Sequence, residues 1–433
     1  MVMKIRKSCL AIISASLISV LLTCCNSNPI QVNVDDLIVP TFSDDKRINI
    51  GSWNWTVKNF NNNQLESLKE AGLNLLIGTF NDRNDNADSS LISRASEYGI
   101  DMIIDKRPWE GTIPIYAEKE NFLGYCVFDE PASSEFLTLK TMKENWDKSD
   151  LKDKMFFVNL NPSYSHNIAG SYEQYVKSYV EDIGLEMVSF DYYPLYRDLF
   201  SDKTALREDW LYNFSIASYY ARKNNIPLWY TLLTTEHNAG GLSYINPTAK
   251  DMEYQMYVAM AFGSKYLIHY TGTATGADHI NPIFDKDGNP TDSYFDVKEA
   301  SETIGKWDSV YMNFDSIGFT GVFGTEDNTG LLDYILKNIN IKDSGALESV
   351  QSNYDLVVGH FEDEHKNKGF VLTNMTNPYD NQDIKAKLKF NSNYQGVKIY
   401  SSSGEEVKSL TNGEIELDII SGSGIFVVPL KTK

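Results

Sequence analysis

Short apolar runs alternate with longer amphipathic segments through the first two thirds of the chain. The apolar runs have the length of buried strands, and several of the amphipathic segments end at a glycine, as helices often do. This alternation is typical of a parallel α/β fold, in which a helix follows each strand. The eight predicted strands are residues 48–53, 73–79, 101–105, 123–128, 155–160, 187–190, 227–233 and 266–270.

Eight such units between residues 46 and 312 match the size of a (β/α)₈ TIM barrel, roughly 250 residues. A doubly wound open sheet is the alternative arrangement of the same elements. The first predicted strand is not followed by the glycine-rich loop that a nucleotide-binding sheet of that type carries. We therefore predict a closed α/β barrel over residues 46–312.

The pattern changes in the last quarter of the chain. Apolar and polar residues alternate strictly in segments such as 384–390 and 414–420, and turn pairs such as Asn412-Gly413 separate the runs. Period-two alternation with short turns indicates antiparallel strands that have one buried face. We predict a small all-β sandwich domain over residues 313–433.

The first 25 residues read as a targeting segment. Basic residues precede an apolar stretch, residues 9–22, that is too short to span a bilayer comfortably. The stretch ends in Leu-Thr-Cys-Cys, which resembles the lipobox of bacterial lipoproteins. This resemblance implies a signal peptide over residues 1–24, a lipid on Cys25 and a tether over residues 25–45.

A lipid anchor of this kind implies an outer-membrane lipoprotein that faces the cell surface or the periplasm. Modification at Cys24, or an ordinary secretory signal, is the alternative. If the leader is removed and Cys25 is acylated, Cys126 is the remaining free cysteine of the mature chain. One cysteine provides neither a disulfide nor a metal-ligand spacing, so we expect Cys126 to be a small buried side chain and expect no metal or other cofactor.

The formal net charge is −20, and no basic stripe interrupts the acidic surface. Nucleic acid is therefore excluded as a partner on electrostatic grounds. A polyanionic substrate would require a local basic patch, which the sequence lacks. A neutral or weakly charged oligosaccharide or polysaccharide fits this charge.

Polar and aromatic residues gather where the predicted strands end. In a (β/α)₈ barrel the loops after the strands form the active face, so these residues should meet there. Carboxylates, amides and imidazoles can bind sugar hydroxyls, while aromatic rings pack on the C–H face of a pyranose. The candidates are Trp53, Trp55, Arg107, Asp129, Glu130, Asn159, Tyr164, His166, Asp191, Tyr193, Glu236, His237 and Tyr270.

Three segments carry a family resemblance: Gly-Tyr-Cys-Val-Phe-Asp-Glu-Pro at 124–131, Asp-Tyr-Tyr-Pro at 191–194 and Met-Ala-Phe-Gly-Ser-Lys at 260–265. They resemble the retaining glycoside hydrolases of clan A, in particular β-galactosidase-like members and related hydrolases among Bacteroidetes lipoproteins. The resemblance implies a glycosidase with Glu130, at the end of strand four, as general acid/base. It also implies Glu236, at the end of strand seven, as the nucleophile of a double displacement.

The chain departs from the family pattern at two places. The clan's asparagine before the acid/base is Asp129 here, and its charge should raise the pKa of one carboxyl of the adjacent pair. The surroundings of Glu236 carry no signature, so its role depends on counting strands. Asp191, which ends strand six, is the competing second carboxylate.

Two other functions fit the same residues. The adjacent Asp129 and Glu130 also resemble substrate-assisted N-acetylhexosaminidases of the family 20 type, in which the aspartate would orient an acetamido group and Tyr192 or Tyr193 would assist. A barrel without catalysis that serves as a glycan-binding surface lipoprotein is the other alternative. Glycan binding without any turnover would distinguish such a binding protein from an enzyme.

Overall fold

The structure is a computed structural model that describes residues 32–57, 60–80, 84–201, 203–274, 276–326, 330–335 and 345–433. The predicted signal peptide, the lipidation residue Cys25 and the first part of the predicted tether lie outside these residues. In the parts of the chain that are described, no helix is both long and apolar enough to cross a membrane.

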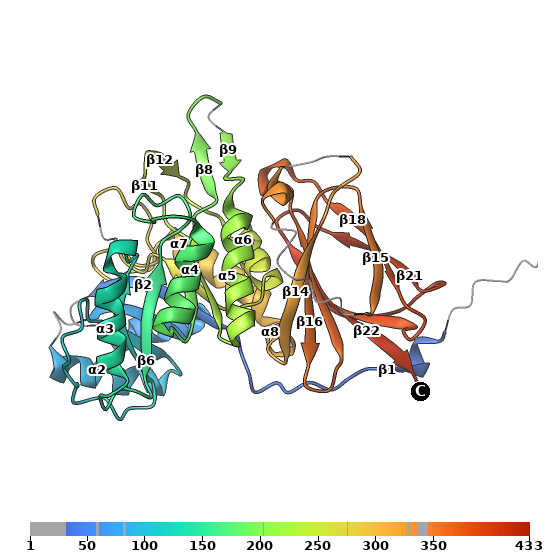
Figure 1. Cartoon of the computed structure of the whole chain (residues 1–433). Coiled ribbons are helices and arrows are strands. Elements are labelled where there is room, and N and C mark those ends of the chain that lie inside the picture. The colour runs from blue at the N-terminus through green and yellow to red at the C-terminus, as the bar shows by residue number, and fades with distance from the viewer. Residues whose placement is uncertain are drawn as a thin grey trace, which may run out of the picture.

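Eight parallel strands close into a barrel in the order β10–β13–β2–β3–β4–β5–β6–β7 (Figure 1). This confirms the predicted TIM barrel, and each predicted strand overlaps an observed one. The barrel strands are β2 (Asn49–Val57), β3 (Leu75–Phe80), β4 (Asp101–Asp105), β5 (Phe122–Asp129), β6 (Met155–Leu160), β7 (Val188–Asp191), β10 (Leu228–Leu233) and β13 (Ser264–Tyr270).

Helices surround the barrel, and side-chain caps fix where several of them begin. At the start of α1 the Asn61 side chain accepts a hydrogen bond from the Gln64 backbone N–H, and the Gln64 side-chain oxygen accepts one from the Asn61 backbone N–H, which is a capping box. The α-helices are α1 (Asn62–Glu70), α2 (Asp85–Glu97), α3 (Phe136–Trp146), α4 (Tyr172–Lys177), α5 (Trp210–Asn224), α6 (Ala249–Ala261), α7 (Asp292–Gly305) and α8 (Asp308–Tyr311). Shorter helical turns are η1 (Val34–Asp36), η3 (Ser133–Glu135), η4 (Ser178–Ile183), η5 (Leu331–Tyr334) and η6 (Pro378–Asp380).

Large side chains fill the barrel interior. Trp229 stacks on Tyr266 at 3.7 Å between ring centroids, and the ring of Phe157 packs edge-on against Trp229 and Trp53. Cys126 is fully buried in the same cluster, as predicted. These side chains fill the interior of the barrel, which leaves the C-terminal ends of the strands as the face for ligands.

A small antiparallel sheet lies over the C-terminal ends of the barrel strands. Its order is β11–β12–β8–β9, and two hairpins build it. These strands are β8 (Leu195–Asp198), β9 (Lys203–Leu206), β11 (His237–Ala239) and β12 (Leu242–Tyr244). The β8–β9 hairpin projects from the top of the molecule (Figure 1).

The C-terminal region is a β-sandwich, as predicted. A larger sheet runs in the order β14–β16–β17–β22–β19–β20 with β1 paired to β22, and a second sheet has the order β15–β18–β21. The strands are β1 (Leu37–Ile38), β14 (Phe314–Val322), β15 (Leu347–Ser352), β16 (Leu356–Asp363), β17 (Lys368–Asn374), β18 (Ile384–Phe390), β19 (Gly396–Ser401), β20 (Gly404–Ser409), β21 (Glu414–Ile419) and β22 (Gly424–Thr432). Because β1 pairs with the last strand, the folded chain begins inside the segment that we predicted to be a tether.

One apolar cluster extends from the barrel helices into the sandwich. Phe262 packs on Phe319 at 4.5 Å between ring centroids, and Trp307 stacks on Phe426 at 5.8 Å. Strand β16 approaches α6 so closely that a Cβ on Gly359 would lie 2.2 Å from the carbonyl oxygen of Ala261. The sandwich is therefore packed directly against the barrel.

Candidate active site

A cavity of about 360 Å³ opens at the C-terminal ends of the barrel strands, beneath the small sheet. The structure brings together many of the residues predicted from the strand ends. These are Trp53, Asp129, Glu130, Asn159, Tyr164, Asp191, Tyr193, His237 and Tyr270. The cavity therefore combines carboxylates with an aromatic wall.

Glu130 follows the last residue of β5 and has a left-handed backbone, with φ of 51°. Its N–H donates to the carbonyl of Asn159 on β6 over 2.8 Å, which holds this unfavourable conformation in place. The side chain is open to the cavity, yet protein atoms surround much of it. This partial desolvation, together with the charge of Asp129, raises the pKa of Glu130 to about 7.

Asp129 is fixed by an arginine. The Arg107 guanidinium donates to Asp129 over 2.6 Å and to Asp105 over 2.9 Å, so one cation serves two carboxylates. Burial raises the pKa of Asp129 and Arg107 opposes this effect. Arg107 was predicted to bind substrate, but it is not among the cavity-lining residues and acts on the position of Asp129.

Asp191 ends β7 and is a buried carboxylate of the cavity. The Asn159 amide donates to Asp191 over 2.7 Å and to Asp129 over 3.3 Å, and Ser189 in turn donates to Asn159. The pKa of Asp191 is raised well above its usual range. Burial is the largest cause, and the negative charge of Glu130 is the second. Asp191 and Glu130 therefore affect each other's ionisation across the same cavity.

Tyrosines form one wall of the cavity. Tyr193 and Tyr270 are stacked, with ring centroids 5.5 Å apart, and Tyr244 packs edge-on against Tyr193. Tyr164 lies under the guanidinium of Arg207, which is 4.0 Å from its ring centroid. Such rings offer flat apolar faces next to hydroxyl groups, as sugar binding requires.

Two histidines stack beside this wall. The rings of His237 and His279 are parallel, with centroids 5.2 Å apart. Nδ1 of His237 lies 2.8 Å from the carbonyl oxygen of Thr235, an acceptor, so this nitrogen carries the hydrogen. Burial, and also the neighbouring His279, lower the pKa of His237. His237 is therefore suited to hydrogen bonding as a neutral imidazole.

Besides Arg107, three predicted site residues are not among those that line the cavity. Trp55 is fully buried in the barrel core against Phe60, with its Nε1 donating to a backbone carbonyl, so its predicted contact with substrate is corrected. His166 is exposed outside the cavity lining. Glu236 is not among the lining residues either, whereas the next residue, His237, is.

Glu236 is half-buried, and its backbone forms a bridge with Ile280, next to the cavity-lining His279. The carboxylates among the described lining residues are Asp129, Glu130 and Asp191. Asp191, at the end of β7, is therefore the carboxylate from another strand that shares the cavity with Glu130.

Some lining residues were not predicted. Tyr244 comes from β12 and His279 from the loop after β13, and neither ends a barrel strand. Thr231 lies within β10, where its inward orientation follows from the closed barrel. The one available sequence signal was the excess of aromatic and polar residues in the long segments after strands seven and eight.

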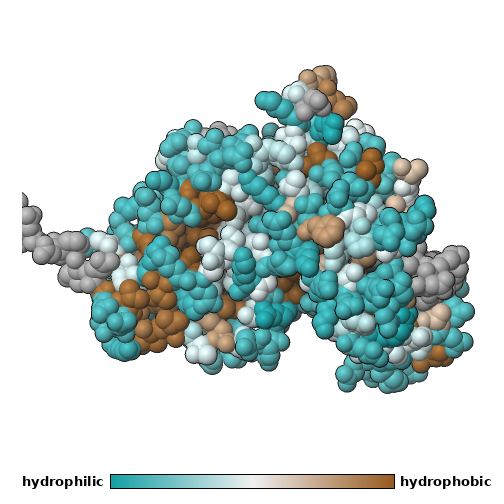
Figure 2. All heavy atoms as spheres, turned by 180° about the vertical axis from the view of Figure 1, so that it is seen from behind, coloured by the Kyte–Doolittle hydropathy of each residue, from teal (hydrophilic) through white to brown (hydrophobic). Residues whose placement is uncertain are grey.

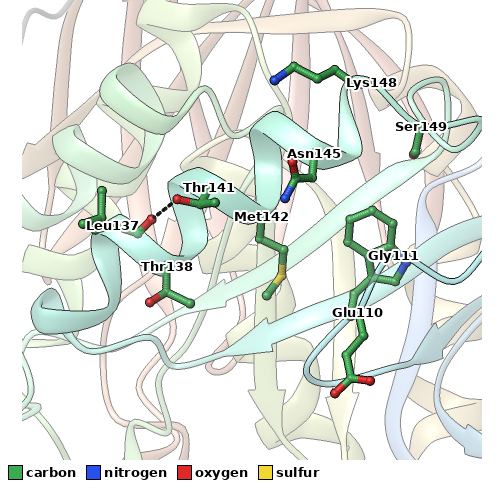
Figure 3. A pocket seen from close by; sticks show the side chains of 10 residues that line it. Glu110, Gly111, Leu137, Thr138, Thr141, Met142, Asn145, Lys148 and Ser149 are labelled. Atoms are coloured by element: carbon green, nitrogen blue, oxygen red, sulfur yellow. Dashed lines mark hydrogen bonds between the residues drawn. The ribbon is translucent and has the colours of Figure 1, made fainter.

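A larger hollow of about 760 Å³ lies elsewhere, between α3 and the loop after β4 (Figure 3). Met142 projects into it from α3, and Glu110 is the single carboxylate among its described lining residues. It therefore lacks a pair of acids. Within the described residues, no group of three or more histidine, cysteine or carboxylate side chains is arranged to hold a metal ion.

No protein-family model and no curated protein sequence matches this chain. Solved structures are similar to it in fold. A GH27 β-L-arabinopyranosidase from Geobacillus stearothermophilus is 11% identical with a TM-score of 0.50, and the match covers 89% of this chain and 97% of that one. An α-amylase from Anoxybacillus is 10% identical over 86% of this chain and 90% of that one, with a TM-score of 0.47. At 11% identity the likeness to the arabinopyranosidase is one of fold alone.

Proposed function

We propose that this protein is a glycosidase that hydrolyses a glycosidic bond in a neutral or weakly charged oligosaccharide or polysaccharide. The observation that carries the proposal is the pair Glu130 and Asp191, two interacting carboxyl groups in one aromatic-lined cavity at the active face of a (β/α)₈ barrel. Acid/base hydrolysis of a glycosidic bond needs two carboxyl groups with different roles. No lysine or arginine is among the described residues that line the cavity, which favours a neutral sugar.

Glu130 is the general acid/base in this proposal. With a pKa near 7 it holds a proton at neutral pH often enough to donate it to the departing oxygen. The exposed position of Glu130 suits contact with the leaving group. After the bond breaks, the ionised Glu130 can accept a proton from the attacking water.

Asp191 takes the place that we first predicted for Glu236. Because Asp191 and Glu130 repel each other when both are ionised, the pair favours a state with one proton, which provides one acid and one carboxylate. Burial favours the protonated form of Asp191, and the amide of Asn159, which donates to Asp191, opposes this effect and favours the ionised form that attack requires. The Asp191 carboxylate attacks the anomeric carbon, forms a glycosyl ester and is released by water, with net retention.

Matched variants test these roles. Glu130→Gln should lower kcat on unactivated glycosides by at least about 100-fold, with a smaller loss on aryl glycosides whose leaving group needs no proton. Asp191→Asn should abolish turnover on both kinds of substrate, and Glu236→Gln is the control that retains activity. The substrates are a panel of aryl glycosides and neutral oligosaccharides. Loss in Glu236→Gln with an active Asp191→Asn would reverse the assignment.

The same panel of substrates also shows whether the protein is an enzyme or a glycan-binding protein without catalysis. If the wild type and Glu130→Gln bind a glycan equally and neither releases product, the protein is a glycan-binding lipoprotein and the hydrolase proposal fails. NMR of the first product distinguishes retention from inversion, and inversion would make Asp191 a base for water.

Substrate-assisted hydrolysis is a second candidate, favoured by the way Asp129 is held. Arg107 and Asn159 both bind Asp129 beside Glu130, as a group that orients an acetamido substituent would require. In this variant of the mechanism the substrate's acetamido oxygen attacks the anomeric carbon. It predicts turnover of N-acetylhexosaminides but not of the corresponding hexosides, and strong inhibition by a thiazoline analogue of the cyclic intermediate. Equal turnover of both sugars would exclude it.

We also propose that the chain is a lipoprotein of the outer membrane, anchored through Cys25. The support is the basic, apolar and Leu-Thr-Cys-Cys succession of the first 25 residues. An anchor would keep the enzyme close to large glycans at the cell surface or in the periplasm.

A further inference from the structure

The β8–β9 hairpin grows directly out of the cavity wall. Tyr196 on β8 pairs with Tyr244 on β12, and Tyr244 lines the cavity. At the base of the hairpin, where β8 begins and β9 ends, the Arg207 backbone N–H donates to the carbonyl of Pro194 over 2.8 Å. The Arg207 guanidinium lies over the ring of Tyr164 and donates to the Tyr244 hydroxyl over 3.4 Å. The base of the hairpin is thus joined to two rings of the cavity.

The sandwich braces the hairpin further out. The Asn377 side-chain amide donates to the carbonyl of Thr204 on β9 over 3.2 Å. Asn377 itself is fixed, because it caps η6. The hairpin is therefore supported from both domains.

The tip of the hairpin is apolar and open to solvent. Leu199 is 77% exposed and Phe200 is fully exposed. The Asp198 side chain holds the turn by accepting hydrogen bonds from the Phe200 N–H and from the Ser201 hydroxyl. Figure 2, seen from behind, shows hydrophobic atoms at the end of this projection. The turn that Asp198 holds thus presents the phenyl ring of Phe200 fully open to solvent in the part of the chain that the structure describes.

β8 ends at Asp198, and Phe200 is the second residue of the turn that follows it. The ring therefore lies four residues from Tyr196, which pairs with the cavity-lining Tyr244. A glycan chain that extends out of the cavity along the hairpin would meet this ring. Burial of an exposed phenyl ring against the C–H face of a sugar is favourable, so contact with Phe200 would stabilise a bound glycan.

We propose that the β8–β9 hairpin tip is a distal saccharide subsite, in which Phe200 packs on the part of a glycan chain that lies outside the cavity. This rests on the proposed glycosidase function and extends it to chain-length specificity. A membrane is the competing occupant of an apolar tip. Continuity with the cavity wall favours the saccharide, and β1, which follows the predicted lipid anchor in the chain, lies on the far side of the sandwich from the hairpin (Figure 1).

The test compares chain lengths. The wild type is first assayed on the panel of aryl glycosides, and oligosaccharides of increasing length are then prepared from the sugar it cleaves. Phe200→Ala should lower kcat/KM on the longest chains by roughly 10-fold, the effect of losing one ring contact, and leave the aryl glycoside rate unchanged. Phe200→Trp should retain the long-chain rate. Phe295→Ala, which removes another exposed phenyl ring on α7, is the matched control.

Each other result has a definite meaning. Equal rates of Phe200→Ala and wild type at every length, or an equal loss at every length, would overturn the subsite while the hydrolase proposal stands. No turnover of any glycoside by the wild type would overturn the proposed function and the subsite with it. If Phe200→Ala loses co-sedimentation with phosphatidylglycerol–phosphatidylethanolamine vesicles and keeps its long-chain activity, the occupant is a membrane and the saccharide assignment fails.

Discussion

At the scale of single residues, Glu130 combines a strained backbone with an unfavourable place for a charge. Its φ is positive, and its pKa is raised by partial desolvation and by Asp129. Both features cost stability, and both put a protonatable carboxyl group at the mouth of the cavity. The hydrogen bond from the Glu130 N–H to the backbone carbonyl of Asn159 ties that position to the residue whose side chain holds Asp129 and Asp191.

The pH dependence of hydrolysis should report this arrangement. A general acid must be protonated, so kcat/KM should fall as the pH rises through about 7. Asp129→Asn removes the nearby negative charge and should move this alkaline limb to lower pH. The measurement is a pH–rate profile of both proteins on one aryl glycoside, and an unshifted limb would contradict the role of Asp129.

The same group should make stability depend on pH. The folded-state pKa of Glu130 is raised above the unfolded value, so the folded state holds the proton more tightly and loses stability as the pH rises toward 7. Glu130→Gln removes the ionisable group and should therefore raise Tm at pH 8 relative to the wild type, with little difference at pH 4. Thermal denaturation at the two pH values checks this. A lower Tm for the variant at pH 8 would argue against a desolvated carboxylate.

At the scale of elements, close backbone contact holds the two domains together. Strand β16 lies against the end of α6, and Gly359 is the residue that permits this approach. The sandwich that is packed against α6 in this way also binds the β8–β9 hairpin, through the hydrogen bond from Asn377 to Thr204. The packing between the two domains therefore bears on the position of the hairpin beside the cavity.

Gly359→Ala should destabilise the protein by about 1–3 kcal/mol or more, because the added methyl group would overlap the carbonyl of Ala261. Gly305→Ala is the matched control. Gly305 ends α7, and an added Cβ there meets nothing within 4 Å. Urea denaturation monitored by tryptophan fluorescence gives both free energies of unfolding. Equal values for the two variants would show that β16 can move away from α6.

At the scale of the whole molecule, the barrel provides the cavity, the small sheet covers it and the sandwich supports that sheet. The predicted lipid anchor lies before β1, whose pairing with β22 places the start of the folded chain on the sandwich. An anchored molecule would therefore be attached through its sandwich and leave the barrel free.

Cys25→Ser should release the protein from the membrane. With Cys25 replaced, the thiol that we expect to accept the lipid is absent, and the full-length chain should move from the membrane pellet to the soluble or processed secreted fraction. Fractionation of cells that express each form, with labelled palmitate incorporation as the second readout, checks this. The matched control is Cys126→Ser, and labelling that persists in Cys25→Ser would point to Cys24.

The sequence by itself determined the order of the elements and the position of the Asp129–Glu130 pair at the end of the fourth barrel strand. It could do so because strand and helix periods and the end of an apolar run are local properties of the chain. Only the tertiary structure decided that Asp191 lines the cavity while Glu236 is not among its lining residues, that Trp55 belongs to the core, and that Tyr244 and His279 join the cavity. These outcomes depend on which side an extended segment faces and on where long connections return, and closure of the barrel fixes both.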